Sequence, residues 1–86
     1  MNITFSDIAW NDLLAIAQDR RLLKRLNQLI TDIQRDGTSG IGKPEPLSGE
    51  LSGFFSRRID ERHRLIYRIV DGTIEIVQCQ GHYNDR

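Results

Sequence analysis

The sequence has few of the residues that form covalent or metal-held scaffolds, and it has no long apolar run. Its single cysteine, Cys79, rules out a disulfide within the chain, and no cysteines and histidines are spaced as metal ligands. The N-terminus lacks the basic start and apolar run of a signal peptide. No stretch approaches the roughly 18 apolar residues of a membrane span. We therefore expect a soluble, cytoplasmic protein with neither metal nor cofactor.

Net charge is also absent, because 12 lysine and arginine residues balance 12 aspartate and glutamate residues. A neutral chain is not expected to bind polyanions in general. The distribution is uneven, however, and Asp60 and Glu61 are the only acids among a group of arginines. The members of this group are Arg57, Arg58, Arg62, Arg64 and Arg68. The chain can therefore carry a local basic face.

The 86 residues, of which 38% are hydrophobic, suffice for one domain with one core, spanning residues 1–86. Ser6 is placed to cap a first helix, and Asp19 is placed to cap a second one. Apolar residues of the first helix recur every three or four positions, at Trp10, Leu13, Leu14 and Ala17. The second helix has a core-forming stripe of Leu22, Leu26, Leu29, Ile30 and Ile33. Gly37 is expected to end it.

Strand-like segments occupy the rest of the chain. Ile3–Phe5 is a short first candidate, and residues 37–53 form a long loop rich in glycine that contains both prolines. Loops of this length within compact domains are often functional. Three runs follow it, Phe54–Ile59, Arg64–Val70 and Thr73–Gln80, with the dipeptide Asp71-Gly72 as a hairpin turn between the last two.

The hairpin turn fixes a register. A two-residue loop pairs Val70 with Thr73 and therefore Tyr67 with Ile76, so alternate residues share a face. The expected core face consists of Leu65, Tyr67, Ile69, Ile74 and Ile76. The expected opposite face consists of Arg64, Ile66, Arg68, Glu75, Val77 and Cys79. An odd-numbered loop before Arg64 adds Arg58 to this second face, whereas an even-numbered loop sends the two arginines to opposite sides.

The predicted fold class is α+β, with two N-terminal helices packed on one face of a small twisted antiparallel sheet and a cationic open face on the other side. RNA can be cut by its own 2′-hydroxyl if a base, a phosphate clamp and an acid are supplied. Glu45, Arg58, Arg64 and His82 offer these groups outside the predicted helices. From residue types alone, each also fits a structural role, such as a solvated loop carboxylate for Glu45. Arg62 and His63 fit a solvated turn, and Arg68 fits a cross-strand ion pair with Glu75.

Five motifs, in the same order along the chain as in a known family, favour the functional roles of these residues over the structural ones. They are GKPEPL at residues 42–47, LSG at 51–53, SRRI at 56–59, HRLIY at 63–67 and HY at 82–83. Together they closely resemble the YoeB toxin family, a branch of the RelE/ParE superfamily of toxin–antitoxin systems. The resemblance extends over nearly the whole chain and implies a RelE-like fold.

The resemblance implies roles for individual residues. Glu45 corresponds to the general base for the 2′-hydroxyl, and Arg58 and Arg64 to the arginines that bind the scissile phosphate. His82 corresponds to the general acid for the leaving group, and Tyr83 orients the substrate or stacks on a base.

Two further motif positions, Lys43 and Arg57, are expected to contact backbone phosphate. Two positions depart from the family pattern. Ser48 stands where many members have a lysine, and Asn84–Arg86 extend beyond the HY pair, at which close relatives often stop.

The resemblance also implies a substrate and partners. The substrate is mRNA in the ribosomal A site, cut without a metal ion. The partner is a YefM-like antitoxin whose disordered C-terminal segment folds over the toxin, and a homodimer is compatible with the family. Two alternatives stay open, a ParE-like gyrase poison and a catalytically silent module that binds an antitoxin and regulates transcription with it.

Overall fold

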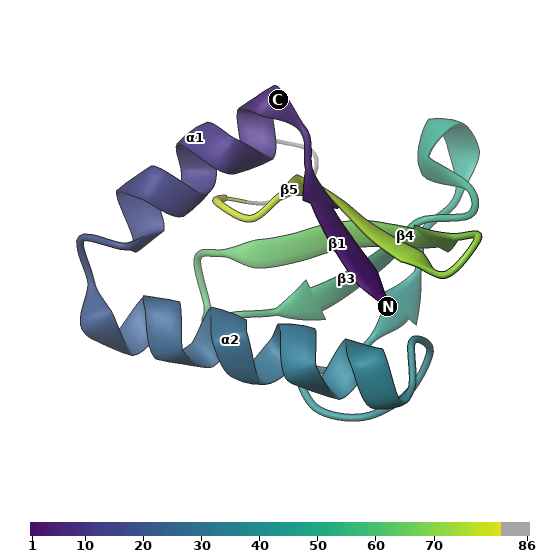
Figure 1. Ribbon diagram of the computed structural model, residues 1–86, viewed down its shortest axis with the longest axis horizontal. Coiled ribbons are helices and arrows are strands. Elements are labelled where there is room, and N and C mark those ends of the chain that lie inside the picture. Colours follow the sequence, from purple (N-terminus) through teal and green to yellow (C-terminus); the bar gives the residue numbers. More distant parts are fainter. Residues whose placement is uncertain (82–86) are drawn as a thin grey trace.

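The computed structural model describes residues 1–81, which form two helices and a five-stranded sheet. In chain order the elements are β1 (Asn2–Phe5), α1 (Asp7–Ile16), α2 (Arg20–Arg35), β2 (Glu45–Pro46), a 3₁₀ turn (Gly49–Leu51), β3 (Phe55–Arg58), β4 (Arg64–Val70) and β5 (Thr73–Gln78). The helices form a V that opens toward the strands (Figure 1). The predicted α+β fold, with both helices packed on one face of the sheet, is confirmed.

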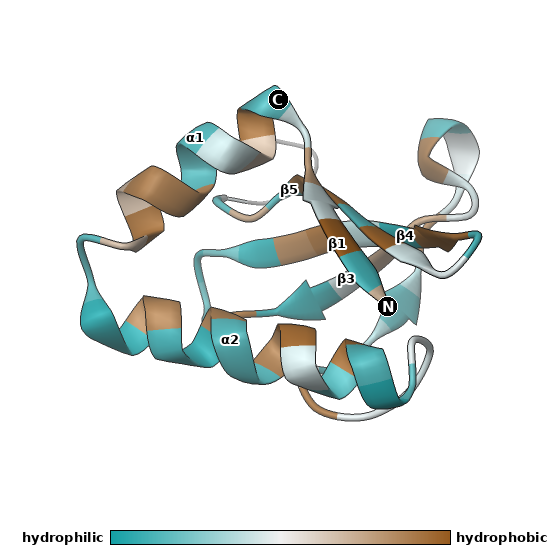
Figure 2. Ribbon diagram, in the orientation of Figure 1, coloured by the Kyte–Doolittle hydropathy of each residue, from teal (hydrophilic) through white to brown (hydrophobic). Residues whose placement is uncertain are grey.

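Both predicted helix caps are present. The Ser6 hydroxyl accepts a hydrogen bond from the Ala9 amide at 3.1 Å, and the Asp19 carboxylate accepts from the amides of Arg21 and Leu22. The apolar stripe of α2 is buried as expected, with Leu26, Leu29 and Ile33 inaccessible to solvent. Figure 2 shows this brown apolar side of α2 turned toward the strands and its teal side turned outward.

Gly37 plays a different role from the predicted one. Helix α2 ends at Arg35, and its cap Asp36 already has an extended backbone. Gly37 does not adopt a positive φ. Gly37 instead lies in close contact with the Ile69 side chain, whose end would have to shift to make room for a Cβ atom at residue 37.

The buried face of α1 differs from the predicted stripe. Trp10 and Leu14 are about half exposed, at 52% and 51%, whereas Ala9, Asp12 and Ile16 face inward. This orientation of α1 includes a polar contact with the sheet, in which the Asp12 carboxylate accepts a hydrogen bond from the backbone amide of Cys79 at 3.1 Å. A short apolar pattern cannot reveal that an acidic residue faces the sheet.

The predicted hairpin register is confirmed from Val70–Thr73 to Tyr67–Ile76. A β-bulge then shifts the register, so that Ile66 pairs with Gln78 and Val77 is the extra residue. The bulge reverses the alternation, and Cys79 therefore lies fully buried in the core instead of on the opposite face. Its interpretation as a buried residue is confirmed, but its predicted face is wrong.

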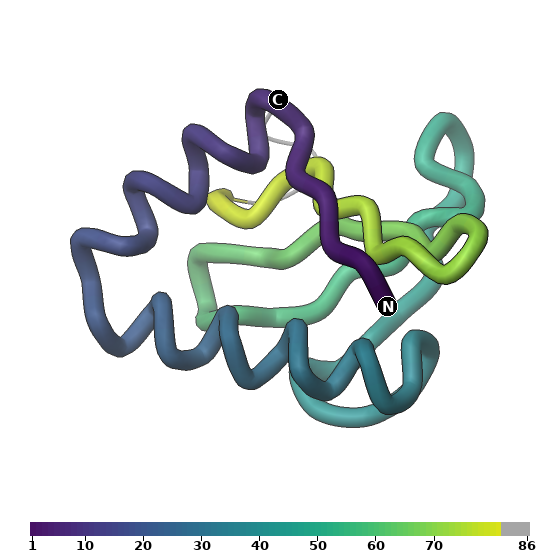
Figure 3. Tube along the Cα trace, viewed as in Figure 1, coloured from purple at the N-terminus to yellow at the C-terminus, as the bar shows by residue number. Residues whose placement is uncertain are grey.

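The sheet is mixed, with strand order β1-β5-β4-β3-β2. β1 runs parallel to β5, with Ile3 opposite Ile74, and the other strand pairs are antiparallel. The expectation of a wholly antiparallel sheet is therefore corrected at this edge. A trace of the chain shows the long segment between α2 and β3 looping past the C-terminal half of α2 before the 3₁₀ turn projects from the body (Figure 3). Within residues 1–81, no helix is long and apolar enough to cross a membrane.

Candidate active site

The strand register gathers four of the polar side chains on the sheet face that the helices leave open. Glu45 pairs with Ser56 across β2 and β3, and Arg58 pairs with Arg64 across β3 and β4. Directly opposed residues share a face. The connection between β3 and β4 comprises residues 59–63, an odd number, so the predicted placement of Arg58 beside Arg64 is confirmed. We call this surface the Glu45–Arg64 face.

Glu45 and Arg64 form the central ion pair of this face. A guanidinium Nη1 of Arg64 lies 3.7 Å from a carboxylate oxygen of Glu45, and it donates a hydrogen bond to the Ser56 hydroxyl at 3.2 Å. The Glu45 side chain is 54% exposed, whereas that of Arg64 is only 17% exposed. A positioned guanidinium therefore lies beside a carboxylate that solvent or a substrate can reach.

The sheet fixes the position of Glu45, although the sequence around it has the composition of a loop. The amide of Leu47 donates to the carbonyl of Phe54 at 2.9 Å, and the amide of Arg58 donates to the carbonyl of Gly42 at 2.6 Å. These bonds extend the pairing with β3 on both sides of Glu45. Lys43 adopts a left-handed backbone, with φ of 51°, and its side chain is exposed. Glu45 therefore projects from an anchored segment.

Arg57 lies on the opposite face of β3 and is fully buried. Its Nη1 forms an ion pair with Asp32 at 2.5 Å and also donates to the carbonyl of Ile41. Its Nη2 donates to the carbonyls of Asp36 and Ser39, and its Nε donates to the Tyr67 hydroxyl. All five N–H groups of the guanidinium therefore have partners. This burial contradicts the expected contact between Arg57 and RNA phosphate.

The buried guanidinium organises the loop that leads to Glu45. Asp32 accepts a further hydrogen bond from the amide of Ile41 at 3.0 Å, and the Asp36 carboxylate binds Thr38 and Ser39. The hydrogen bond from Arg57 holds the pKa of Asp32 below its ordinary value of 3.8. Burial raises the pKa of Tyr67, so its hydroxyl stays protonated and donates to the carbonyl of Gly37 at 2.7 Å.

The lowered pKa of Asp32 predicts how stability depends on pH. The unfolded chain binds this proton more readily than the folded one, so the stabilisation is complete above about pH 4 and is lost as the pH falls through the folded-state pKa. Asp32→Asn should therefore reduce the loss of unfolding free energy between pH 5 and 2.5, as measured by urea denaturation. Equal losses in both proteins would contradict this assignment.

The sequence is similar to a known family of bacterial toxins over nearly its whole length. The family described as "YoeB-like toxin of bacterial type II toxin-antitoxin system" matches residues 5–83. The chain belongs to this family. Toxin YoeB of Streptomyces coelicolor is 52% identical over 96% of the chain and 100% of the relative. Toxin YoeB of Escherichia coli K12 is 45% identical, with the same coverage.

Solved structures of YoeB toxins show the same fold. A YoeB/ParE toxin from Agrobacterium tumefaciens has a TM-score of 0.93 at 36% identity, covering 96% of this chain and 100% of that one. The toxin in a YoeB–YefM complex from Staphylococcus aureus has a TM-score of 0.88 at 44% identity, covering 96% and 98%. The resemblance stated from the sequence motifs is therefore confirmed.

The remaining predicted positions of this YoeB-like toxin are placed as follows. Ser48 is exposed and directly precedes the projecting 3₁₀ turn. Arg68 and Glu75 form the expected cross-strand ion pair at 2.5 Å, and Arg62 lies in an exposed turn. His82 and Tyr83 lie outside the described residues, as do Asn84–Arg86.

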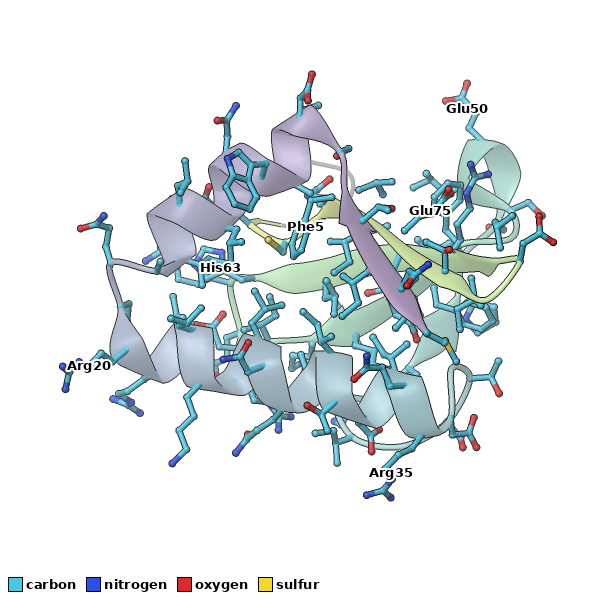
Figure 4. The ribbon with its side chains drawn as sticks, viewed as in Figure 1. Phe5, Arg20, Arg35, Glu50, His63 and Glu75 are labelled. Atoms are coloured by element: carbon cyan, nitrogen blue, oxygen red, sulfur yellow. The ribbon has the colours of Figure 1, made fainter. Side chains whose placement is uncertain are left out.

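His63 has a contact that its interpretation as a solvated turn residue did not anticipate. Its Nδ1 atom accepts a hydrogen bond from the backbone amide of Gly81 at 2.9 Å. Figure 4 shows His63 at the end of the sheet near the connection between the helices. The sequence signal that could have identified it is its position directly before Arg64, at the start of β4.

One hollow of this YoeB-like toxin, lined by described residues, lies away from the Glu45–Arg64 face. It is an open groove of about 710 Å³ along the outer side of α2, lined in part by Arg20, Lys24 and Arg35 and by Ile41 of the following loop. Arg20 and Arg35 point away from the sheet (Figure 4). None of the lining residues belongs to the Glu45–Arg64 face. Among residues 1–81, no group of three or more histidine, cysteine or acidic side chains could hold a metal ion.

Proposed function

We propose that this YoeB-like toxin is a ribosome-dependent endoribonuclease that cuts mRNA by metal-free acid–base catalysis and thereby inhibits translation. The observation that carries the proposal is the exposed Glu45 carboxylate beside the held guanidinium of Arg64, with Arg58 directly opposite Arg64 on the same face. A base next to two phosphate-binding cations is the combination that transesterification of RNA requires.

The reaction uses the RNA 2′-hydroxyl as the nucleophile. Glu45 removes its proton, and the 2′-oxygen then attacks the adjacent phosphorus. Arg64 and Arg58 neutralise the charge that develops on the phosphoryl oxygens, with Lys43 as an outer contact to backbone phosphate. His82 protonates the departing 5′-oxygen, and Tyr83 orients the substrate. The products carry a 2′,3′-cyclic phosphate and a free 5′-hydroxyl.

The partners follow from the same assignment. The S. aureus relatives have been solved as YoeB–YefM complexes and as a YoeB dimer. For this toxin we propose a YefM-like antitoxin that covers or distorts the Glu45–Arg64 face, and a homodimer in its absence. The ribosomal A site holds the mRNA against this face, which places the activity in the cytoplasm.

The proposed endoribonuclease has two alternatives. One is a ParE-like toxin that poisons gyrase, and the other is a catalytically silent module that only binds an antitoxin. A gyrase poison has no need for the Glu45–Arg64 pair. The silent module rests on Ser48, which stands where many YoeB toxins have a lysine. Growth arrest on expression separates a live toxin from the silent module, and the chemistry of the cleaved ends separates a nuclease from a gyrase poison.

The test uses purified toxin with ribosomes programmed with a short mRNA. We expect a cut within the A-site codon and much slower cleavage of the same RNA without ribosomes. The slow cleavage of free RNA should persist in EDTA, which tests metal independence without dissociating the ribosomes. An intact message on programmed ribosomes would overturn the proposed function.

Arg64→Ala should slow single-turnover cleavage by about 10²–10³-fold, as expected for loss of one preorganised charge at the transition state. Arg64→Lys should recover part of the rate, because it restores a charge but not the planar guanidinium. Arg62→Ala is the matched control, since this neighbouring arginine lies in an exposed turn. Equal rates for Arg64→Ala and Arg62→Ala would remove Arg64 from the mechanism.

A further inference from the structure

The end of β5 is held in place by side chains once its neighbouring strand has ended. β1 pairs with β5 only from Thr73 to Ile76, since the chain turns into α1 at Ser6. Beyond that point the Ser6 hydroxyl donates to the carbonyl of Val77 at 3.1 Å, and Asp12 accepts from the amide of Cys79. Helix α1 therefore replaces the missing strand on this edge.

The opposite edge is held from the start of β4. The amide of Arg64 donates to the carbonyl of Gly81 at 2.9 Å, and the amide of Gly81 donates to Nδ1 of His63 at 2.9 Å. Gly81 adopts a φ of 73°, a conformation that favours glycine. Both backbone polar groups of Gly81 thus bind the dipeptide His63-Arg64.

His63 is itself well fixed. Its amide donates to the Asp60 carboxylate at 2.8 Å, and its carbonyl accepts from the amide of Ile59 at 2.9 Å. An Nδ1 atom that accepts a hydrogen bond requires the neutral imidazole with its proton on Nε2. The side chain therefore acts as a defined acceptor and is more than a solvated turn residue.

We propose that His63 is a positioning residue whose hydrogen bond from Gly81 fixes the Gly81 backbone beside Arg64 for catalysis. This inference rests on the proposed function, in which the next residue along the chain, His82, is the general acid. The dipeptide His63-Arg64 then contacts both the general base and the residue directly before the general acid. The Arg64 side chain pairs with Glu45, while the His63 side chain and the Arg64 backbone fix the residue before the acid.

Two substitutions separate positioning from folding. His63→Leu removes the acceptor and keeps a similar volume, whereas His63→Asn places an amide oxygen near the position of Nδ1. His63→Leu should lower kcat on programmed ribosomes by about 10–100-fold and leave KM nearly unchanged, as expected for a misplaced catalytic group. His63→Asn should restore most of kcat. Thermal unfolding of both variants controls for a loss of folded protein.

A direct measurement of the contact needs no RNA. We would record the scalar coupling between the backbone nitrogen of Gly81 and Nδ1 of His63 by NMR of ¹⁵N-labelled toxin, in the Glu45→Gln background that avoids growth arrest. We expect the coupling with His63 present and its loss in His63→Leu. Absence of the coupling with His63 present would overturn the inference, whatever the nuclease activity.

The other outcomes are equally decisive. If the coupling is present but His63→Leu cleaves as fast as wild type, the positioning role fails and the proposed function stands. If His63→Asn is as slow as His63→Leu at equal thermal stability, the acceptor is not what matters, and the inference fails. If the wild type itself does not cleave, the proposed function falls and the catalytic role of His63 falls with it.

Discussion

Glu45→Gln is expected to slow single-turnover mRNA cleavage by about 10²–10⁴-fold, the range typical of a lost general base. Glutamine has nearly the shape of glutamate but cannot accept the 2′-hydroxyl proton. The Glu45 side chain is 54% exposed and its ion pair with Arg64 is long, at 3.7 Å. The substitution should therefore cost little folding free energy, since exposed ion pairs contribute about 0–1 kcal/mol. Rates are measured on programmed ribosomes with toxin in excess.

Glu50→Gln is the matched control for this experiment. Glu50 lies five positions further along the chain, in the 3₁₀ turn Gly49–Leu51, and its carboxylate points away from the sheet (Figure 4). Both variants make the same change of charge in the same region. Cleavage by Glu45→Gln at the rate of Glu50→Gln would exclude Glu45 as the base.

Arg57→Met is expected to lower the free energy of unfolding by about 3–5 kcal/mol, the usual cost of breaking a buried ion pair by removing one partner. The Asp32 carboxylate would lose its cation, and the carbonyls of Asp36, Ser39 and Ile41 would lose their donors. Small domains have only about 5–15 kcal/mol in total. Urea unfolding of the purified protein measures the loss.

Arg68→Met provides the comparison for Arg57→Met. Arg68 also forms an ion pair in the sheet, with Glu75, but its side chain is 47% exposed. Its loss should cost at most about 1 kcal/mol. The double variant Asp32→Leu/Arg57→Met should recover part of the stability of Arg57→Met, because it no longer leaves an uncompensated carboxylate. Similar losses of unfolding free energy for Arg57→Met and Arg68→Met would show that the buried Arg57 network stabilises the fold no more than an exposed ion pair does.

The sequence allowed prediction of features that depend on neighbouring residues. The caps Ser6 and Asp19, the apolar stripe of α2 and the hairpin register all follow from local rules and were confirmed. The register also placed Arg58 beside Arg64, because an odd loop length preserves strand alternation.

Features decided by distant contacts were not predictable in this way. The bulge at Val77 moved Cys79 into the core, and no local signal marks the extra residue. The parallel pairing of β1 joins segments about 70 residues apart. The inward-facing side of α1 includes Asp12, which binds Cys79, a residue almost as distant in sequence.

The candidate site was only partly predictable for a related reason. Motif resemblance predicted site roles for Glu45, Arg58 and Arg64, but it also predicted a contact between Arg57 and RNA phosphate. Strand alternation already placed Arg57 on the same side as Ile59, the core side, and this was the available sign that it is structural. The side-chain contact of His63 was missed because its partner, Gly81, lies 18 residues away in the sequence.

The most direct test of the account is cleavage of an mRNA with a single 2′-deoxy nucleotide on the 5′ side of the scissile phosphate. We predict that this message stays intact on programmed ribosomes, whereas the all-ribose message yields a 2′,3′-cyclic phosphate or 3′-phosphate and a free 5′-hydroxyl. Cleavage of the deoxy message at the same position, or ends with a 3′-hydroxyl and a 5′-phosphate, would contradict it, because either result requires a nucleophile other than the RNA itself.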